Sequence, residues 1–144
     1  MTEWEGLIRV SLALLAGALI GFEREWKKKP AGLRTYALVC QGCAIFMVLG
    51  ILLSQEVSSS GSVDASRIAS TVVQGIGFLA GGVIFTVGAR VQGLTTAAAV
   101  WVTAAIGLVI GGGFYIIGFG SVLLALVVLR TLVPVEERII GSEN

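Results

Sequence analysis

The chain has 144 residues, of which 56% are hydrophobic and 13% are charged, and its net charge at pH 7 is +1. A soluble domain of this size carries about a quarter of its residues as charges, so this composition predicts an integral membrane protein. The near-neutral charge balance argues against a nucleic-acid partner, which needs clustered Lys and Arg. Histidine is absent, which removes the commonest transition-metal ligand and the usual general base. We therefore expect no enzyme, no catalytic residues and no cofactor.

Five hydrophobic segments follow one another, each close to the length of about 20 residues that crosses a bilayer as a helix. They are residues 5–22, 33–53, 67–87, 94–111 and 114–133. The first follows acidic and not basic residues, so we interpret it as a mature helix and not as a signal peptide. Only the triple glycine 111–113 separates the last two, and one long bent helix is the alternative there. The predicted fold class is an all-α membrane protein of about five tightly packed transmembrane helices, with a membrane domain at 1–135 and a short cytoplasmic tail at 136–144.

The first loop sets the expected orientation, because Lys and Arg in short loops are retained on the cytoplasmic side. This loop holds Arg24, Lys27, Lys28, Lys29 and Arg34. We therefore expect the N-terminus outside and the first loop and the C-terminus inside. The outer segment 58–62 is small and polar, as a flexible connection should be.

Small residues recur at four-residue spacing within the predicted spans. The pairs are Gly17 with Gly21, Gly77 with Gly81, and Gly107 with Gly111. In lipid, such pairs let helix backbones approach closely and gain dispersion contacts. The pattern favours helix packing within one subunit, and a seam between copies in a homo-oligomer is the alternative.

Charged residues in or beside the spans need partners, because a charge at the centre of a membrane helix costs at least about 2.5 kcal/mol. Arg9 lies one helical turn after Glu5, which predicts a local ion pair near the outer surface, and a functional role for Arg9 is the alternative. Glu23 ends the first helix, where the negative end of the helix dipole disfavours a carboxylate. A nearby cation must therefore hold it, and Arg24, Arg34 or a bound metal ion could do so. An internal salt-bridge network is favoured, and an ion-handling site stays open.

Further polar residues lie at the ends of the third and fourth spans and in the middle of the third. Asp64 or Ser66 can cap the third helix, and Thr95 and Thr96 can cap the fourth or line an ion or lipid headgroup site. Together with the first loop they form a candidate functional polar cluster, in which the sequence identifies no metal ligand set. Its members are Glu23, Arg24, Glu25, Arg34, Thr35, Asp64, Arg67, Gln74, Thr95 and Thr96.

Cys40 and Cys43 have the spacing of dithiol oxidoreductases and of half a zinc site. Both lie inside the second predicted span, and no second Cys pair or His completes a metal shell. Packing within the helix bundle is therefore the favoured interpretation of this pair, and a redox or metal role is the alternative.

Several unusual segments, taken in order, resemble the MgtC/SapB inner-membrane proteins of bacteria. They are Gly-Ala-Leu-Ile-Gly-Phe-Glu-Arg-Glu at 17–25, Ala-Gly-Leu-Arg-Thr at 31–35, Asp64 with Ser-Arg-Ile at 66–68, Gln-Gly-Ile-Gly-Phe-Leu at 74–79, and Gly-Leu-Thr-Thr-Ala-Ala at 93–98 leading into Trp101. Where the family usually has Gly-Phe-Leu-Gly-Ala-Gly, this chain has Gly-Phe-Leu-Ala-Gly-Gly at 77–82. The exchange of two small residues should keep the packing.

The resemblance implies a five-span, multi-pass domain of the bacterial inner (plasma) membrane. It further implies a regulator in magnesium and energy homeostasis and in virulence-related adaptation, with a link to the F-type ATP synthase. The expected partners are membrane lipid, a second copy of the chain in a homo-oligomer, with a dimer favoured, and a membrane complex such as this synthase. Many members carry a soluble C-terminal domain that we do not expect here. The alternative function is a small oligomeric ion or metal transporter.

Overall fold

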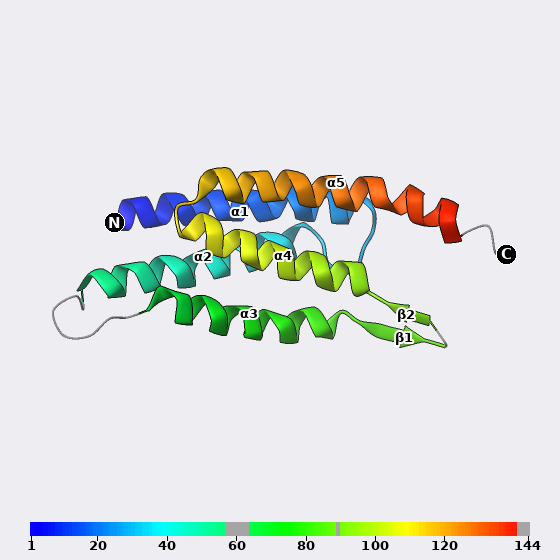
Figure 1. Cartoon of the computed structure of the whole chain (residues 1–144), viewed down its shortest axis with the longest axis horizontal. Helices are drawn as coiled ribbons and strands as arrows, with labels where there is room; N and C mark the ends of the chain where they lie inside the picture. The colour runs from blue at the N-terminus through cyan, green and yellow to red at the C-terminus, as the bar shows by residue number, and fades with distance from the viewer. Residues whose placement is uncertain (57–63, 89, 141–144) are drawn as a thin grey trace.

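The structure is a computed structural model, and it describes residues 1–56, 64–88 and 90–140. Five helices make up most of it: α1 (Glu3–Trp26), α2 (Leu33–Glu56), α3 (Ala65–Gly82), α4 (Leu94–Gly111) and α5 (Tyr115–Ile140). They lie along one long axis, and successive helices run in opposite directions (Figure 1). The predicted all-helical class is confirmed, apart from one short hairpin. The predicted connection 58–62 lies outside the described residues.

A β-hairpin between α3 and α4 was not predicted. Its strands, β1 (Phe85–Val87) and β2 (Arg90–Gln92), pair antiparallel. The third helix was expected to reach Val87, and this prediction is wrong because α3 ends at Gly82. Two consecutive glycines at 81–82 weaken the helix, and the following Phe-Thr-Val favours a strand.

The beginnings of the helices follow local capping rules in two cases. Thr2 and Glu5 form a reciprocal capping box at α1, and the carboxylate of Asp64 accepts a hydrogen bond of 2.8 Å from the backbone N–H of Ser66 at α3. The predicted cap of the third helix is therefore confirmed. At α4 the N-cap is Gly93, whose φ of 89° places it in the left-handed region, so no threonine hydroxyl takes this role.

Helix α4 is the centre of the bundle. It contacts each of the other four helices, and 61% of its residues are buried inside the protein. Its C-terminal turn ends at Gly112 and Gly113, and the φ of 91° at Gly113 lets the chain reverse into α5. The predicted division of the last apolar stretch into two helices is confirmed.

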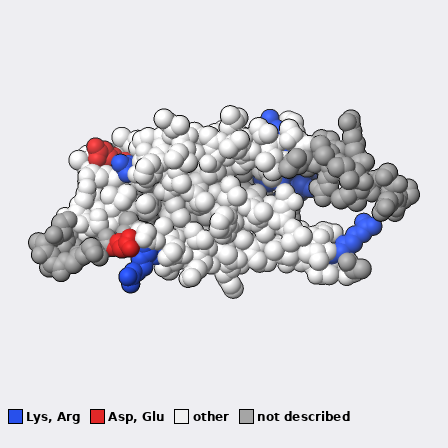
Figure 2. All heavy atoms as spheres, viewed as in Figure 1, with Lys and Arg blue, Asp and Glu red and all other residues white. Residues whose placement is uncertain are grey.

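The outer surface of the bundle is largely apolar. Phe78, Ile116 and Leu124 are 84%, 91% and 67% exposed. Figure 2 shows that the charged atoms on one face lie towards the two ends of the molecule, with an uncharged zone between them. The helices α1, α2 and α4 are long and apolar enough to cross a membrane, and the apolar part of α5, Tyr115–Thr131, is shorter. Such an exposed apolar belt is typical of a surface in contact with lipid.

Candidate functional site

A buried ion pair lies near the C-terminal end of α1. Glu23 and Arg24 are only 3% and 1% exposed, and the Arg24 Nε lies 2.7 Å from the Glu23 Oε2. The ammonium of Lys27, one turn later on the same helix, lies 3.1 Å from the other carboxylate oxygen. Both oxygens of Glu23 are therefore occupied by cationic partners. A buried charge is tolerated only when it is paired in this way.

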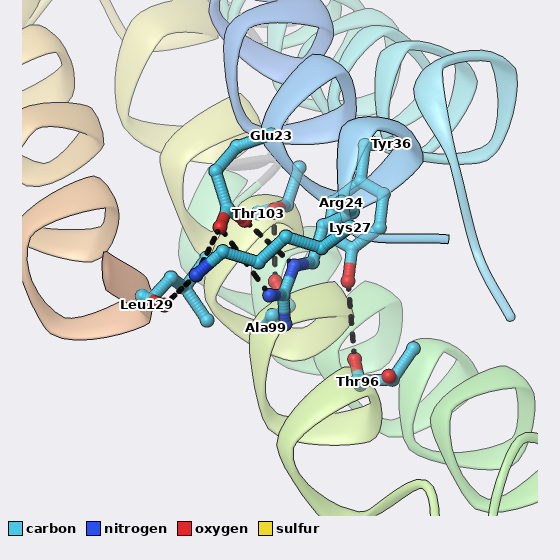
Figure 3. A network of polar contacts seen from close by, with 8 residues as sticks. All are labelled: Glu23, Arg24, Lys27, Tyr36, Thr96, Ala99, Thr103 and Leu129. Atoms are coloured by element: carbon cyan, nitrogen blue, oxygen red, sulfur yellow. Dashed lines mark hydrogen bonds and ion pairs between the residues drawn. The ribbon is translucent and has the colours of Figure 1, made fainter. Parts of the chain in front are cut away.

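Lys27 also connects the ion pair to another helix. Its Nζ donates a hydrogen bond of 3.1 Å to the backbone oxygen of Leu129 on α5 (Figure 3). Close by, the hydroxyl of Tyr36 on α2 donates to the backbone oxygen of Thr96 on α4 at 3.4 Å. One polar network thus lies where α1, α2, α4 and α5 come together. It is an internal network, as the sequence favoured.

The other residues of the first loop play different parts. Glu25 is exposed, and its carboxylate accepts a 2.7 Å hydrogen bond from the backbone N–H of Leu33 at the start of α2. A carboxylate at a helix N-terminus is stabilised by the free N–H groups and by the helix dipole. Arg34 and Thr35 are exposed, and Arg34 is not among the partners of Glu23. Arg34 was predicted as a candidate partner of the Glu23 carboxylate, whereas Lys27 was not.

The polar residues of α3 lie away from this network. Asp64, Arg67 and Gln74 are all exposed, and the N-terminus of α3 is at the opposite end of the molecule from the first loop (Figure 1). The hydrogen bonds from Ser66 hold the pKa of the Asp64 carboxyl below its usual value of 3.8. The predicted cluster of ten residues is therefore not one site: seven lie at the end of the bundle that holds the first loop, Asp64 and Arg67 lie at the opposite end, and Gln74 lies halfway along α3. At α4, Thr95 is exposed and Thr96 is buried.

Arg9 has a different partner from the one predicted. It donates from Nη1 to the backbone oxygen of Gly111, at 3.1 Å, whereas the Glu5 carboxylate accepts from the backbone N–H of Thr2. The expected Arg9–Glu5 pair is wrong. The last carbonyls of α4 have no partners within their helix and carry its negative dipole end, which makes them good acceptors for a guanidinium. Gly113 leaves room for it, because a Cβ there would lie 2.9 Å from the Arg9 Cζ.

Four of the six spaced glycines lie in tight helix contacts. An added Cβ at Gly17 would lie 2.6 Å from the Cys40 Cβ, and one at Gly21 would lie 2.8 Å from the Leu33 Cα. Gly107 and Gly111 of α4 approach α2 in the same way, with Cys40 and Ala44 as neighbours. Gly77 and Gly81 on α3 differ, because nothing lies within 4 Å of either added Cβ.

Cys40 and Cys43 are buried, and both are free thiols. Cys40 lies in the contacts made by Gly17 and Gly107, which is the packing role that the sequence favoured. Among the described residues, no three Cys, Asp or Glu lie together where they could hold a metal ion.

Among the described residues, hollows open on the surface at two places of interest. A groove of about 800 Å³ runs between α2 and α3, and its lining is apolar except for Arg67, Thr71 and Cys43. A smaller cavity of about 400 Å³ lies between the end of α1 and α5, beside the ion-pair network.

Comparison with known proteins gives consistent similarities. The sequence profile described as the MgtC family matches residues 10–138. The chain is 48% identical over 126 residues to a putative magnesium transporter, YhiD, of Escherichia coli K12, and 44% identical over 107 residues to the protein MgtC of Salmonella typhimurium. An uncharacterised protein of Synechocystis is 42% identical over 134 residues.

These alignments cover most of this chain but not most of its relatives. They include 85%, 74% and 90% of the chain, but only 59%, 43% and 55% of the relatives from Escherichia, Salmonella and Synechocystis. The chain thus spans about half the length of the curated relatives it matches. No solved structure matches the chain significantly.

Proposed function

The chain belongs to the MgtC family of membrane proteins, and from this premise we propose that it is a non-enzymatic, multi-pass protein of the bacterial inner membrane. It acts through helix contacts inside the membrane, with a second copy of itself and with a larger membrane complex. The purpose of these contacts is to adjust magnesium and energy homeostasis, including adaptation during virulence. The resemblance to the family makes the F-type ATP synthase the first candidate complex.

The observation that carries this proposal is the row of exposed glycines on α3. Gly75, Gly77, Gly81 and Gly82 have open space where a side chain would be, although they lie in a helix that packs against α2 and α4. Exposed glycines weaken a helix and contribute no packing of their own. In lipid they become useful when another helix approaches closely, as the buried glycines of α1 and α4 already demonstrate within this chain.

The groove beside α3 supports the same proposal. It is open, almost wholly apolar and lined by Gly42 and Gly75, so that a helix could approach both α2 and α3 closely there. A helix from outside the chain would gain dispersion contacts along its length without burying a charge.

A small oligomeric ion transporter is the second candidate, because one 48% identical relative is named as a putative magnesium transporter. The charges of the Glu23 network favour the contact-based function over this one. Both Glu23 oxygens face cations, and the cations of the network outnumber its carboxylate. A hard divalent cation needs free oxygen ligands. Flux of magnesium, sodium, potassium or protons in liposomes would favour the transporter if it is lost in Glu23→Gln protein that circular dichroism shows to be folded.

The contact-based function is tested by filling the open face of α3. We expect Gly77→Leu to abolish self-association in mild detergent, measured by light scattering, and to reduce capture of membrane partners from bacterial membranes. Gly120→Leu is the matched control, because Gly120 on α5 also has open space around it. A wild-type chain that is strictly monomeric and captures no membrane partner would contradict the proposal.

A further inference from the structure

The smaller cavity has an aromatic wall on one side and charged side chains on the other. It is lined by Phe22, Glu23 and Trp26 of α1, by Lys27 directly after this helix, and by Arg130 of α5. Phe22 and Trp26 lie one turn apart with ring centroids separated by 6.1 Å, and they are 56% and 79% exposed. One wall of the cavity is therefore aromatic, and the rest is ionic.

The ionic part carries excess positive charge. Among the described residues, Glu23 is the one carboxylate of the lining, and it is already held by Arg24 and Lys27. Arg130 is exposed and has neither a hydrogen bond nor an ion pair among the described residues. Lys27 donates to Glu23 and to Leu129, so one of its three N–H groups is still available. Within the described part of the chain, Lys27 thus shares one carboxylate with Arg24, Arg130 has no counter-charge, and the cavity carries excess positive charge.

The cavity lies at the level of a membrane surface. Trp4 and Trp26 of α1 are both largely exposed, at 76% and 79%. They are separated by about 33 Å at the rise of an α-helix, which is close to the thickness of a hydrocarbon core of about 30 Å. Exposed tryptophans at this spacing are typical of the two interfaces of a bilayer. Trp26 is therefore at headgroup level, and Phe22 is one turn deeper, among acyl chains.

We propose that this cavity binds the phosphate group of an anionic phospholipid, with Arg130 and Lys27 as the phosphate ligands and Phe22 and Trp26 beside the acyl chain. A guanidinium and an ammonium are the usual partners of phosphate oxygens. The volume of about 400 Å³ accommodates a headgroup and the first part of a chain, but not a whole lipid. This site is independent of the proposed function, since neither the open face of α3 nor self-association enters the argument.

Retention of positive charge on the cytoplasmic side does not explain this arrangement. Lys28 and Lys29 lie exposed in the loop and suffice for that purpose. The ammonium of Lys27 is held by the Glu23 carboxylate and by the backbone oxygen of Leu129, which is next in the chain to Arg130. Fixed cations bind a phosphate at a lower entropic cost than loop lysines do.

The test uses Trp26 as the reporter, in the full chain with Trp4→Phe and Trp101→Phe. The protein is reconstituted with brominated phosphatidylglycerol or brominated phosphatidylcholine, and quenching of Trp26 fluorescence is followed as the mole fraction of quencher rises. We expect half-maximal quenching at a several-fold lower fraction of the anionic lipid. Arg130→Gln should remove this difference, and Arg130→Lys should keep most of it.

Arg90→Gln is the matched control. Arg90 is an exposed cation on β2, which lies at the same end of the molecule as the C-terminal end of α1 (Figure 1), and it does not line the cavity. Equal quenching by the two lipids, or an equal loss in Arg90→Gln and Arg130→Gln, would overturn the proposal. Relief of quenching by inorganic phosphate at matched ionic strength would also overturn it, because the ligand would then be a soluble phosphate.

Discussion

Two groups of glycines with the same four-residue spacing lie in opposite environments. Gly17 and Gly107 lie where helices touch, and a single added carbon would collide with backbone or with a Cβ of α2. Gly77 and Gly81 of α3 have the same spacing and no neighbour within 4 Å. Spacing therefore indicates that a helix can be approached closely, and it does not indicate whether the approaching helix belongs to the same chain.

The comparison extends to the charged residues. In the body formed by α1, α2, α4 and α5, Glu23 and Arg24 are buried and paired. On α3, Arg67 and Asp64 are exposed. The body should therefore respond strongly to small changes, whereas α3 should tolerate them unless a partner covers it.

The largest effect is expected from breaking the buried ion pair. Glu23→Gln leaves the Arg24 guanidinium buried without its counter-charge, which should lower the free energy of unfolding by about 3–5 kcal/mol. Thermal unfolding in detergent, followed by circular dichroism, measures the loss. Arg34→Gln is the control, because Arg34 is exposed at the same end and takes no part in the ion pair, and it should unfold as wild type does. If Glu23→Gln unfolds no more easily than Arg34→Gln, Glu23 is not buried in the body of the fold.

The next effect is expected from filling a tight helix contact. Gly107→Ala places a Cβ against the Cys40 backbone and 3.0 Å from the Cys43 Cβ, so α2 and α4 must move apart. Overpacking of this kind typically costs about 1–3 kcal/mol. The same unfolding experiment measures it, with Gly42→Ala as control, since a Cβ at Gly42 meets nothing within 4 Å. Unchanged stability of Gly107→Ala would mean that the α2–α4 contact is looser than the structure has it.

On α3, the same kind of substitution is expected to raise folding stability instead of lowering it. Gly77→Ala adds a methyl group in open space, and alanine is better than glycine inside a helix by about 1 kcal/mol. The dilute protein in detergent should therefore become slightly more stable, as judged by its unfolding temperature. Destabilisation comparable to that of Gly107→Ala would break the comparison, because α3 would then be packed against a second chain even in dilute solution.

Local signals in the sequence predicted much of the fold. Apolar length located the five helices, the triple glycine 111–113 separated α4 from α5, and Asp64 marked the beginning of α3. The hairpin was missed because hydropathy treats the Phe-Thr-Val of 85–87 as a continuation of the apolar run. The glycine pair 81–82, which ends the helix, was interpreted only as packing.

The candidate site was predicted less completely, because its partners come from other helices. The i to i+4 spacing of Glu23 and Lys27 could have identified that pair, since such neighbours face each other on a helix. The contacts of Lys27 with Leu129 and of Arg9 with Gly111 join residues distant in the chain. They depend on how α1 packs against α4 and α5, which no local pattern specifies.

The smallest effect is expected at the exposed cap of α3. Hydrogen bonds from Ser66 stabilise the charged form of Asp64 and keep its pKa below 3.8 in the folded chain. A depressed pKa means that the cap contributes stability above the unfolded value, and that this contribution is lost as the pH falls through the folded value. Carboxyl carbon NMR should report a titration midpoint below 3.8. Asp64→Asn is the control, because an amide oxygen still caps the helix but does not titrate, so α3 should then keep its first turn at acid pH. A midpoint at or above 3.8 would mean that Asp64 does not cap α3, and the beginning of this helix would then depend on its packing against α2 and α4 alone.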